Sequence, residues 1–337
     1  MNLPSNSTKP GRLAQWLGLG LIALLFYAML TAMVLLASFV LLQRGVTPDF
    51  PWVAAVQKHL YIKAMRSIWQ AKSDCVEFDA ELIYKPKLGS CQFNNAEFNT
   101  TPNFTADGRL TGPKPAGVGI AVLGDSHAMG WGVEDDATFA TELQRLSKRP
   151  VYNLAVSSYG TLREVHRLEK TALWDKIDTI IIQYCDNDLA ENQSGKINGT
   201  AENRQTFETI MHGKQNTGGL FKVVRKAYGY AFSTPFRSLK PQKAKPPEDF
   251  TPHYAPLIDV LSQYPKLKEK RVLIFYSNAH GKPFGSFPVG RDKRLANVEF
   301  IELGLDAGDY YRLDDHLTPF GHQKVTRELF AALQKIK

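Results

Sequence analysis

The sequence predicts an α/β protein in which helices cover both faces of a parallel β-sheet. From residue 118 onwards, short apolar stretches rich in β-branched residues alternate with segments of helical periodicity. This alternation is typical of parallel strands joined by helical crossovers. The chain of 337 residues is 44% hydrophobic and 22% charged, which is a globular composition that can bury a sizeable core.

The expected elements follow one another in order along the chain. Strands are predicted at 118–123, 151–154, 179–184, 271–276 and 298–302. Helices are predicted near 138–147, 161–175, 255–266 and 319–334. The excursion 191–250 interrupts the alternation and contains few long apolar runs. An insertion of that length is usually a functional lid or a disordered loop, and the sequence does not choose between them.

The N-terminal part of the chain indicates a membrane anchor. No charged residue occurs between positions 13 and 43, and the apolar run exceeds the roughly 20 residues that cross a bilayer as a helix. It is also longer than the apolar core of a cleavable signal peptide. We therefore predict a tail at 1–12 and an uncleaved single-span anchor at 13–43. Basic residues flank the run on both sides, so the charge rule leaves the orientation open.

Two further segments precede the predicted sheet domain. Residues 44–74 have apolar side chains at helical spacing. They form either a helix on the lipid head groups or a stalk helix packed on the protein. Residues 75–115 have turn residues at short intervals and are predicted to form a small β-rich lead-in module.

The three cysteines bear on the compartment. Cys75 and Cys91 flank a short polar segment whereas Cys185 is distant, so a Cys75–Cys91 disulfide is the economical interpretation. Such a bridge implies an oxidising compartment, which places the main domain outside the cytoplasm, in the periplasm if the protein is bacterial. Two reduced thiols in a cytosolic domain are the alternative. Cys185 is expected to be a buried packing residue.

The formal net charge of +8 does not identify a partner by itself. Lysine and arginine residues are scattered apart from modest clusters, which favours a solvated surface over a nucleic-acid-binding face. We therefore expect no nucleic-acid partner. A cationic surface is compatible with an anionic glycan or with anionic lipid head groups. Protein partners are left open.

The motif Gly124-Asp125-Ser126-His127 is the focus of the sequence. It follows the apolar run 118–123, which reads as a buried parallel strand that ends in a tight turn. Ligands of open α/β sheets bind beyond the carboxyl ends of the strands, where such turns gather. A serine there can expose its hydroxyl, with backbone N–H groups nearby to receive negative charge.

Three later motifs follow other predicted elements. The stretch 153–160 closes the second strand and contains Ser157 and Ser158. Cys185-Asp186-Asn187-Asp188 directly follows the third strand. Near the end of the chain, Asp314 precedes His316 by two residues, so both side chains lie on the same side of an extended loop. Thr318-Pro319 then reads as the cap and first residue of the closing helix.

Together the four motifs resemble, in order, the motif blocks of the SGNH (GDSL-like) hydrolases. The resemblance covers about residues 118–330. It implies a three-layer α/β/α, flavodoxin-like catalytic domain over 116–337, with the excursion 191–250 as an insertion. The domain would be preceded by the transmembrane helix and the β-rich lead-in.

The resemblance also implies roles for individual residues. Ser126 corresponds to the nucleophile, His316 to the general base and Asp314 to the carboxylate that orients it. The oxyanion hole would consist of the N–H groups of Ser126 and Ser158 and the side-chain amide of Asn187. No metal and no cofactor is expected.

This sequence departs from the family pattern at three places. Ser158 and Cys185 each replace a family glycine, and a serine at position 158 keeps the backbone N–H donor but lacks the conformational freedom of glycine. The spacing Asp-x-His replaces the commoner Asp-x-x-His and leaves Asp315 as the less favoured partner of His316. His322, within the closing helix, is expected to be structural.

The implied reaction proceeds through an acyl-enzyme on Ser126, which is resolved by water or by another hydroxyl. Membrane-tethered extracytoplasmic members often act on cell-surface or exported glycans, as O-acetylesterases or O-acetyltransferases. The resemblance therefore implies a serine-dependent acyl-ester hydrolase or O-acyltransferase, with a carbohydrate or an acylated glycan as substrate. No motif separates hydrolysis from transfer.

Two alternatives come from other classes. Asp125 and His127 resemble the Asp-x-His opening of a metallophosphoesterase, but the further Gly-Asp-x-x-Asp and Gly-Asn-His blocks are missing from the sequence. The second alternative is a non-catalytic SGNH-like subunit that binds glycans or assists assembly in a membrane complex. The substitutions at Ser158 and Cys185 make it plausible, whereas a complete serine, histidine and aspartate set argues against it.

Overall fold

The computed structural model describes residues 11–213, 220–238, 247, 249–278, 282 and 284–335. The chain divides into two compact units. The helical unit comprises residues 1–65 and 218–243, and the sheet unit comprises residues 66–217 and 244–337. Of the expected tail 1–12, residues 1–10 lie outside the described residues.

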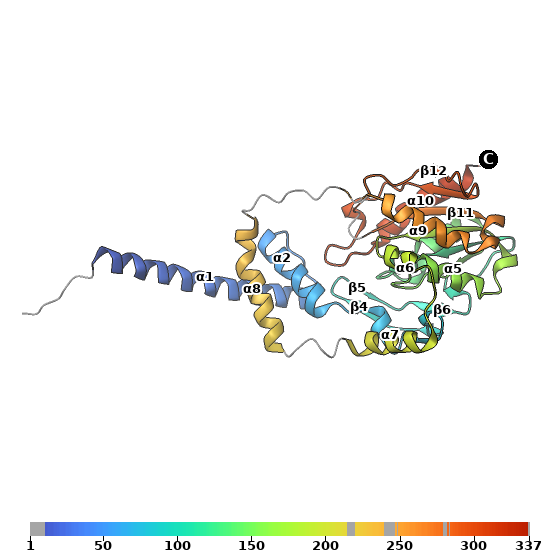
Figure 1. Ribbon diagram of the computed structural model, residues 1–337. Helices are drawn as coiled ribbons and strands as arrows, with labels where there is room; N and C mark the ends of the chain where they lie inside the picture. The colour runs from blue at the N-terminus through green and yellow to red at the C-terminus, as the bar shows by residue number, and fades with distance from the viewer. Residues whose placement is uncertain are drawn as a thin grey trace, which may run out of the picture. The chain divides into compact units, whose positions relative to one another are not determined.

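Three helices pack together in the helical unit: α1 (Arg12–Gln43), α2 (Pro51–Leu60) and α8 (Leu220–Ser238) (Figure 1). A turn of π-helix, Tyr61–Met65, follows α2. The Tyr27 hydroxyl of α1 donates a hydrogen bond to the carbonyl of Phe232 in α8, at 2.6 Å. The indole N–H of Trp52 in α2 donates to the carbonyl of Ala231, at 2.9 Å. The amphipathic segment after the apolar helix is therefore partly used to pack against other helices of this unit.

Helix α1 is the one described helix that is long and apolar enough to cross a membrane. Length and composition alone support this, and an N-terminal signal sequence meets the same criteria. The buried side chains of α1 are confined to its second half, where α2 and α8 pack on it: Thr31, Val34, Ser38 and Leu42.

Five parallel strands form the centre of the sheet unit. They are β8 (Gly119–Leu123), β9 (Val151–Asn153), β10 (Ile177–Tyr184), β11 (Arg271–Tyr276) and β13 (Val298–Ile301). Their spatial order is β9-β8-β10-β11-β13, which is the 2-1-3-4-5 order of flavodoxin-like sheets. All five β8 residues are buried, as expected for a strand covered on both faces.

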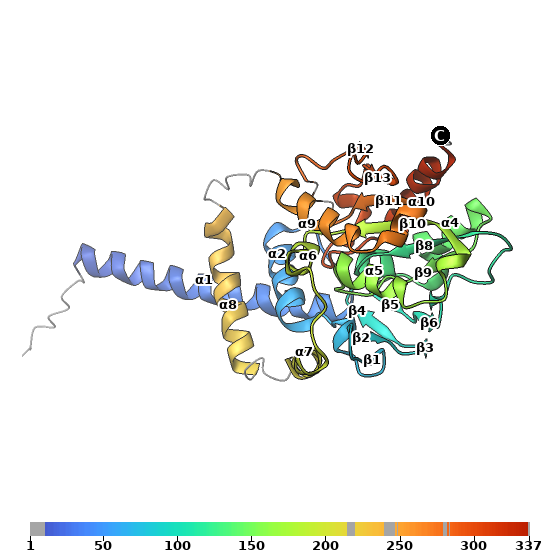
Figure 2. The same cartoon turned by 45° about the vertical axis from the view of Figure 1, so that its right-hand side comes forward.

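Helices cover both faces of this sheet (Figure 2). Ile120 and Val122 of β8 belong to a buried cluster with α4 (Phe139–Ser147) and α10 (Pro319–Gln334). Ala121 and Leu123 face the opposite way, into a cluster with α5 (Thr161–Glu169) and α9 (Thr251–Ser262). This alternation is the two-residue period of a β-strand. The three-layer α/β/α class predicted from the sequence is confirmed.

Helix boundaries differ from the sequence-based expectations in two places. Helix α5 ends at Glu169, six residues before the expected end, and a separate 3-10 turn, Trp174–Lys176, follows. Helix α9 begins at Thr251, with Pro252 in its first turn, and a 3-10 turn at Pro265–Glu269 closes it. Proline is well tolerated there because the first turn of a helix needs no N–H donor.

The lead-in segment consists of short strands, and part of it extends the central sheet. Two hairpins stand apart from that sheet: β1 (Val76–Asp79) with β2 (Ile83–Pro86), and β4 (Phe93–Asn95) with β5 (Phe98–Thr100). Strands β3 (Gly89–Ser90), β6 (Asn103–Thr105) and β7 (Gly108–Arg109) continue the sheet beyond β9. The segment thereby pairs the free edge of β9, whereas β12 (Gly290–Arg291) pairs the opposite edge antiparallel to β13.

Covalent and ionic contacts also join the lead-in to its surroundings. Cys75 and Cys91 form the expected disulfide. The buried guanidinium of Arg109 donates to the carbonyls of Met129 and Val133, at 2.7 and 2.6 Å, and to the Asp135 carboxylate at 2.9 Å. The lead-in is therefore tied to the loop that follows the Gly124–His127 motif.

The excursion 191–250 is largely helical where the structure describes it. Helix α6 (Asp188–Ser194) runs into its start, and α7 (Thr200–His212) follows. The Asn203 side chain of α7 donates to the carbonyl of Ala80, at 2.8 Å, so α7 packs on the β1–β2 hairpin. Helix α8 belongs to the other unit. Within the excursion, residues 214–219, 239–246 and 248 lie outside the described residues.

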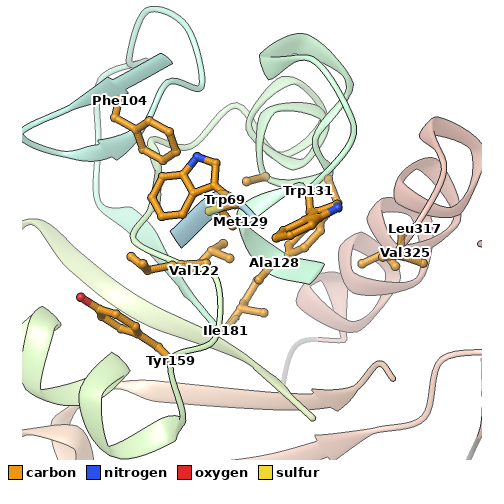
Figure 3. Packing of buried hydrophobic residues seen from close by; sticks show 14 of the residues in the cluster. Trp69, Phe104, Val122, Ala128, Met129, Trp131, Tyr159, Ile181, Leu317 and Val325 are labelled. Carbon is orange, nitrogen blue, oxygen red and sulfur yellow. The ribbon is translucent and has the colours of Figure 1, made fainter. Parts of the chain in front are cut away.

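Side chains from distant parts of the chain meet in the core of the sheet unit (Figure 3). Val122 and Ile181 come from neighbouring strands, and Val325 comes from α10. Trp69, which precedes the lead-in, is fully buried in the same cluster and lies beside Phe104 of β6, with 5.4 Å between ring centroids. The core therefore includes residues from before the predicted start of the domain at 116.

Substitution of Gly108 tests whether the lead-in is an integral part of the sheet. Gly108 has a φ of +99°, and a Cβ atom there would lie 2.1 Å from the carbonyl oxygen of Asn153 in β9. We expect Gly108→Ala to lower the free energy of unfolding by roughly 2–4 kcal/mol, because it adds left-handed strain to a steric clash. Denaturant unfolding measures this loss.

Gly213→Ala is the matched control. Gly213 ends α7 with a φ of −58° and has open space around the position of a Cβ atom. Its substitution should change the free energy of unfolding by no more than about 0.5 kcal/mol. Equal effects of the two substitutions would contradict the close packing of the lead-in on β9.

Candidate active site

Ser126 begins the short helix α3 (Ser126–Met129), directly after β8. Gly124 has a φ of +146°, and a Cβ there would lie 2.6 Å from the Cβ of Ala128, so the tight turn requires glycine. The side chain of Asp125 caps α3 by accepting from the N–H of His127 at 2.9 Å. The Gln183 side chain of β10 accepts from the N–H groups of Asp125 and Ala128, at 3.1 and 3.2 Å. Two neighbouring strands thus hold the serine turn.

His316 and Asp314 approach Ser126 from the loop before α10. The Nε2 atom of His316 lies 2.6 Å from the Ser126 Oγ atom, and its Nδ1 atom lies 2.5 Å from Asp314 Oδ1. Asp314 is fully buried and His316 is 4% exposed. The structure therefore brings the three residues into one hydrogen-bonded row, although 190 positions separate Ser126 from His316.

Asp315 does not contact the histidine ring in this way. Its side chain is 29% exposed and lies 3.6 Å from the guanidinium of Arg66, while its N–H donates to Asp314 Oδ1 at 2.8 Å. Of the two candidate carboxylates, Asp314 is the one beside His316.

Two residues that the sequence did not single out support the loop of Asp314. Glu97, in the turn between β4 and β5, accepts from the N–H groups of Arg312, Leu313 and Asp314 at 2.9, 2.8 and 2.8 Å. Burial raises the pKa of the Glu97 carboxyl. Trp131 donates its indole N–H to Asp314 Oδ2 at 3.3 Å and stacks on the His316 ring, with 4.5 Å between centroids.

The sequence contains no local signal for Glu97, because its partners lie more than 200 positions away. Trp131, by contrast, has a local signal in the sequence. It lies within the first motif stretch, as Gly130-Trp131-Gly132, and an aromatic residue between two glycines near a serine turn could have suggested a functional role.

The loop that contains Ser158 lies beside the serine turn. The N–H of Val156 donates to the carbonyl of Gly124 at 3.0 Å. Ser158 has a φ of +60°, so it adopts the left-handed conformation in which glycine is usual. Its hydroxyl accepts a hydrogen bond from the Gln70 side chain at 2.8 Å. The backbone at Ser158 therefore adopts the left-handed region even though the residue has a Cβ.

The third motif divides between an exposed and a buried side chain. Asn187 is exposed, and its amide donates to Asp125 Oδ2 at 3.2 Å, next to Ser126 in the chain. Asp188 is fully buried and accepts from the N–H of Cys185 and from the Thr161 hydroxyl, both at 2.9 Å. Burial and the nearby Asp125 raise the pKa of the Asp188 carboxyl. Asp188 thus makes hydrogen bonds inside the protein, whereas Asn187 lies at the surface near the serine.

The remaining candidates lie in buried positions. Cys185 is buried, as expected, and burial raises the pKa of its thiol well above the ordinary value. His322 accepts from the N–H of Phe139 at 3.2 Å, and burial lowers its pKa to about 3, so the ring is neutral. The His127 ring lies 4.7 Å from that of His316, and burial lowers its pKa. In the described part of the chain, no group of three or more His, Cys, Asp or Glu side chains is placed to hold a metal ion.

Comparisons with known proteins give a likeness to solved structures. No protein-family model matches the chain, and no curated protein matches it. A family two carbohydrate esterase from Clostridium thermocellum is 13% identical, with a TM-score of 0.33, and the match covers 67% of this chain and 66% of that chain. An acetyl xylan esterase variant from Geobacillus stearothermophilus is 12% identical, with a TM-score of 0.30, over 66% of this chain and 96% of that one.

A carbohydrate acetylesterase family member from Sinorhizobium meliloti is similar to the same extent. It is 14% identical, with a TM-score of 0.29, over 64% of this chain and 98% of that chain.

The left-handed conformation of Ser158 can be tested by comparing two substitutions. Ser158→Gly and Ser158→Ala both remove the hydroxyl, but only alanine keeps a Cβ in the left-handed region. We expect the glycine variant to be the more stable by about 1 kcal/mol in the free energy of unfolding. Denaturant unfolding of the pair measures the difference. Equal stabilities would contradict the assigned backbone conformation.

Proposed function

We propose that this protein is a serine-dependent acyl-ester hydrolase or O-acyltransferase that acts on a carbohydrate. The observation that carries the proposal is the unbroken row of hydrogen bonds from Asp314 through His316 to Ser126. The reaction type follows from this row, because a serine beside a carboxylate-oriented histidine is an activated nucleophile. The carbohydrate substrate follows from the resemblance of the four motifs to the SGNH hydrolases together with the predicted membrane anchor, because membrane-tethered extracytoplasmic members often act on glycans.

The proposed chemistry begins with transfer of the Ser126 hydroxyl proton to His316 Nε2 as the Oγ atom attacks the ester carbonyl. Asp314 orients the imidazole and stabilises the imidazolium that forms. The N–H groups of Ser126 and Ser158 and the side-chain amide of Asn187 would donate to the oxyanion. Such a donor is typically worth roughly 3–4 kcal/mol of the barrier. Asn187 would first have to leave its hydrogen bond to Asp125.

Collapse of the intermediate expels the alcohol, which takes its proton from His316, and leaves an acyl group on Ser126. His316 then deprotonates either water or the hydroxyl of an acceptor, which attacks the acyl-enzyme. Hydrolysis and transfer share every step except this one. An acetyl donor offered with an oligosaccharide acceptor separates them, because transfer acetylates the acceptor and hydrolysis releases acetate.

We further propose that α1 anchors the protein in a membrane and that the sheet unit lies outside the cytoplasm. Residues Arg12–Thr31 of α1 rise about 30 Å, which is the thickness of the hydrocarbon core. Every buried side chain of α1 lies at or beyond Thr31. These contacts favour a span over the earlier part of the helix, with packing against α8 beginning at Tyr27. The Cys75–Cys91 disulfide favours an oxidising compartment.

Active-site labelling tests the nucleophile. The full-length chain in detergent is exposed to a fluorophosphonate and to p-nitrophenyl acetate, and peptide mass spectrometry identifies the labelled residue. We expect Ser126 to be labelled, and Ser126→Ala to lose the label and at least about 10³-fold of the esterase rate.

Ser147→Ala, at the end of α4, is the matched control and should retain both properties. Absence of labelling in a folded sample would favour the non-catalytic glycan-binding or assembly subunit instead. A label on another residue would mean that Ser126 is not the nucleophile.

Fractionation tests the anchor and its orientation. In a bacterial host, the full chain should stay with the membranes after alkaline extraction, because a spanning apolar helix is held by its burial in hydrocarbon. External protease should digest the sheet unit in spheroplasts but leave a cytoplasmic marker intact. Protection of the sheet unit would place it on the cytoplasmic side.

A further inference from the structure

The segment Arg66–Gln70, which we call the strap, contacts two loops of the candidate active site. It begins one residue after the π-helical turn that ends at Met65 and precedes the lead-in strands. We propose that the strap positions the acid–base loop through Arg66 and the oxyanion loop through Gln70. The proposal rests on the function proposed above, and it makes both strap residues positioning residues for that reaction.

Arg66 supports the carboxylate of Asp314. One guanidinium nitrogen lies 3.1 Å from Asp314 Oδ1 and 3.3 Å from His316 Nδ1. When Nδ1 donates its proton to Asp314, Arg66 can donate only to the carboxylate, so its contact with the ring is electrostatic. The guanidinium also lies 5.2 Å from the centre of the Trp131 ring, which stacks on His316. Arg66 thus fixes the same carboxylate oxygen that orients the histidine.

Gln70 supports the loop of Ser158. Its amide nitrogen donates to the Ser158 hydroxyl at 2.8 Å, and its amide oxygen accepts from the Ser157 hydroxyl at 3.0 Å. These two hydrogen bonds grip a loop whose left-handed serine is unfavourable by itself. The loop conformation decides where the Ser158 N–H points, so Gln70 helps to fix the direction of the proposed oxyanion donor.

The strap is itself held firmly between its two contacts. Trp69 is fully buried and packs on Phe104 (Figure 3). Ser67 exchanges two hydrogen bonds with Asn95 of β4: its N–H donates to the Asn95 side chain at 2.6 Å, and its carbonyl accepts from it at 3.2 Å. Because the strap is anchored in the core, its polar side chains hold the loops rather than follow them.

The consequence for catalysis is geometric. The proposed base and the proposed oxyanion donor lie on loops that are far apart in the sequence and that the strap joins from one side. A misplacement of about 1 Å in such a site can cost roughly 10²-fold in rate. Of the segment 44–74, for which the sequence left a head-group helix and a stalk helix open, the part Arg66–Gln70 therefore belongs with the candidate active site.

Kinetics of strap variants in the full-length detergent-solubilised protein test the proposal. Arg66→Gln and Gln70→Ala should each lower kcat for p-nitrophenyl acetate by roughly 10- to 100-fold and change KM by less than about 3-fold, because they disturb loop geometry rather than substrate contacts. Arg66→Lys should recover part of the loss, since a lysine keeps the charge but not the forked geometry.

Lys72→Gln is the control, because it removes one positive charge from the same region without touching either loop contact; it should retain the wild-type kcat. Thermal unfolding checks that each variant is folded. If Arg66→Gln and Gln70→Ala both keep the wild-type kcat, the proposal is wrong.

Hydrogen exchange separates this proposal from the function on which it rests. Arg66→Gln should raise amide exchange in residues 310–318, Gln70→Ala should raise it in 154–160, and Lys72→Gln should change neither. If the variants show this pattern but the wild-type protein is not labelled at Ser126, the proposed reaction is rejected and the positioning role of the strap is supported. Unchanged exchange in both loops, in a protein that does label, would overturn the strap and leave the reaction standing.

Discussion

The buried carboxylate of Asp314 imposes the strongest constraint on the architecture of the site. A charge that is fully removed from water is costly unless hydrogen bonds and opposite charges compensate for it. Here His316, the Trp131 indole and Arg66 approach its two oxygens, and the N–H of Asp315 completes the set. These partners come from a strap, a loop after α3 and the C-terminal loop itself. The demand for compensation thus brings distant segments together around one side chain.

The parallel sheet supplies the frame on which these segments meet. The turns after β8, β9 and β10 all lie at the same edge, because the carboxyl ends of parallel strands coincide. Gln183 of β10 accepts from the backbone N–H groups around Ser126, and the N–H of Val156, after β9, donates to the carbonyl of Gly124. The serine turn is therefore held by hydrogen bonds from both neighbouring strand segments.

The residues before the first parallel strand have a larger role than a connector would need. Glu97 of the β4–β5 hairpin holds the backbone of the Asp314 loop, and Arg109 of β7 holds the backbone after α3. The strap adds Arg66 and Gln70. A domain boundary drawn at residue 116, where the α/β alternation begins, omits all four. The boundary at Arg66 between the two compact units includes them.

Local patterns in the sequence were sufficient for the five parallel strands, most helices and the disulfide. Apolar runs and helical periodicity report burial directly, and the two cysteines lie only 16 positions apart. The meeting of Ser126, His316 and Asp314 was expected from the resemblance of their motifs to the SGNH hydrolases, and the structure places the three side chains in one hydrogen-bonded row. Tertiary structure alone decided the contacts of Glu97, Arg66 and Gln70. It also decided the packing of α8 on α1. Their partners are 87 to 250 positions away, and a charged or amide side chain produces no periodic sequence pattern from which such a distant contact could be predicted.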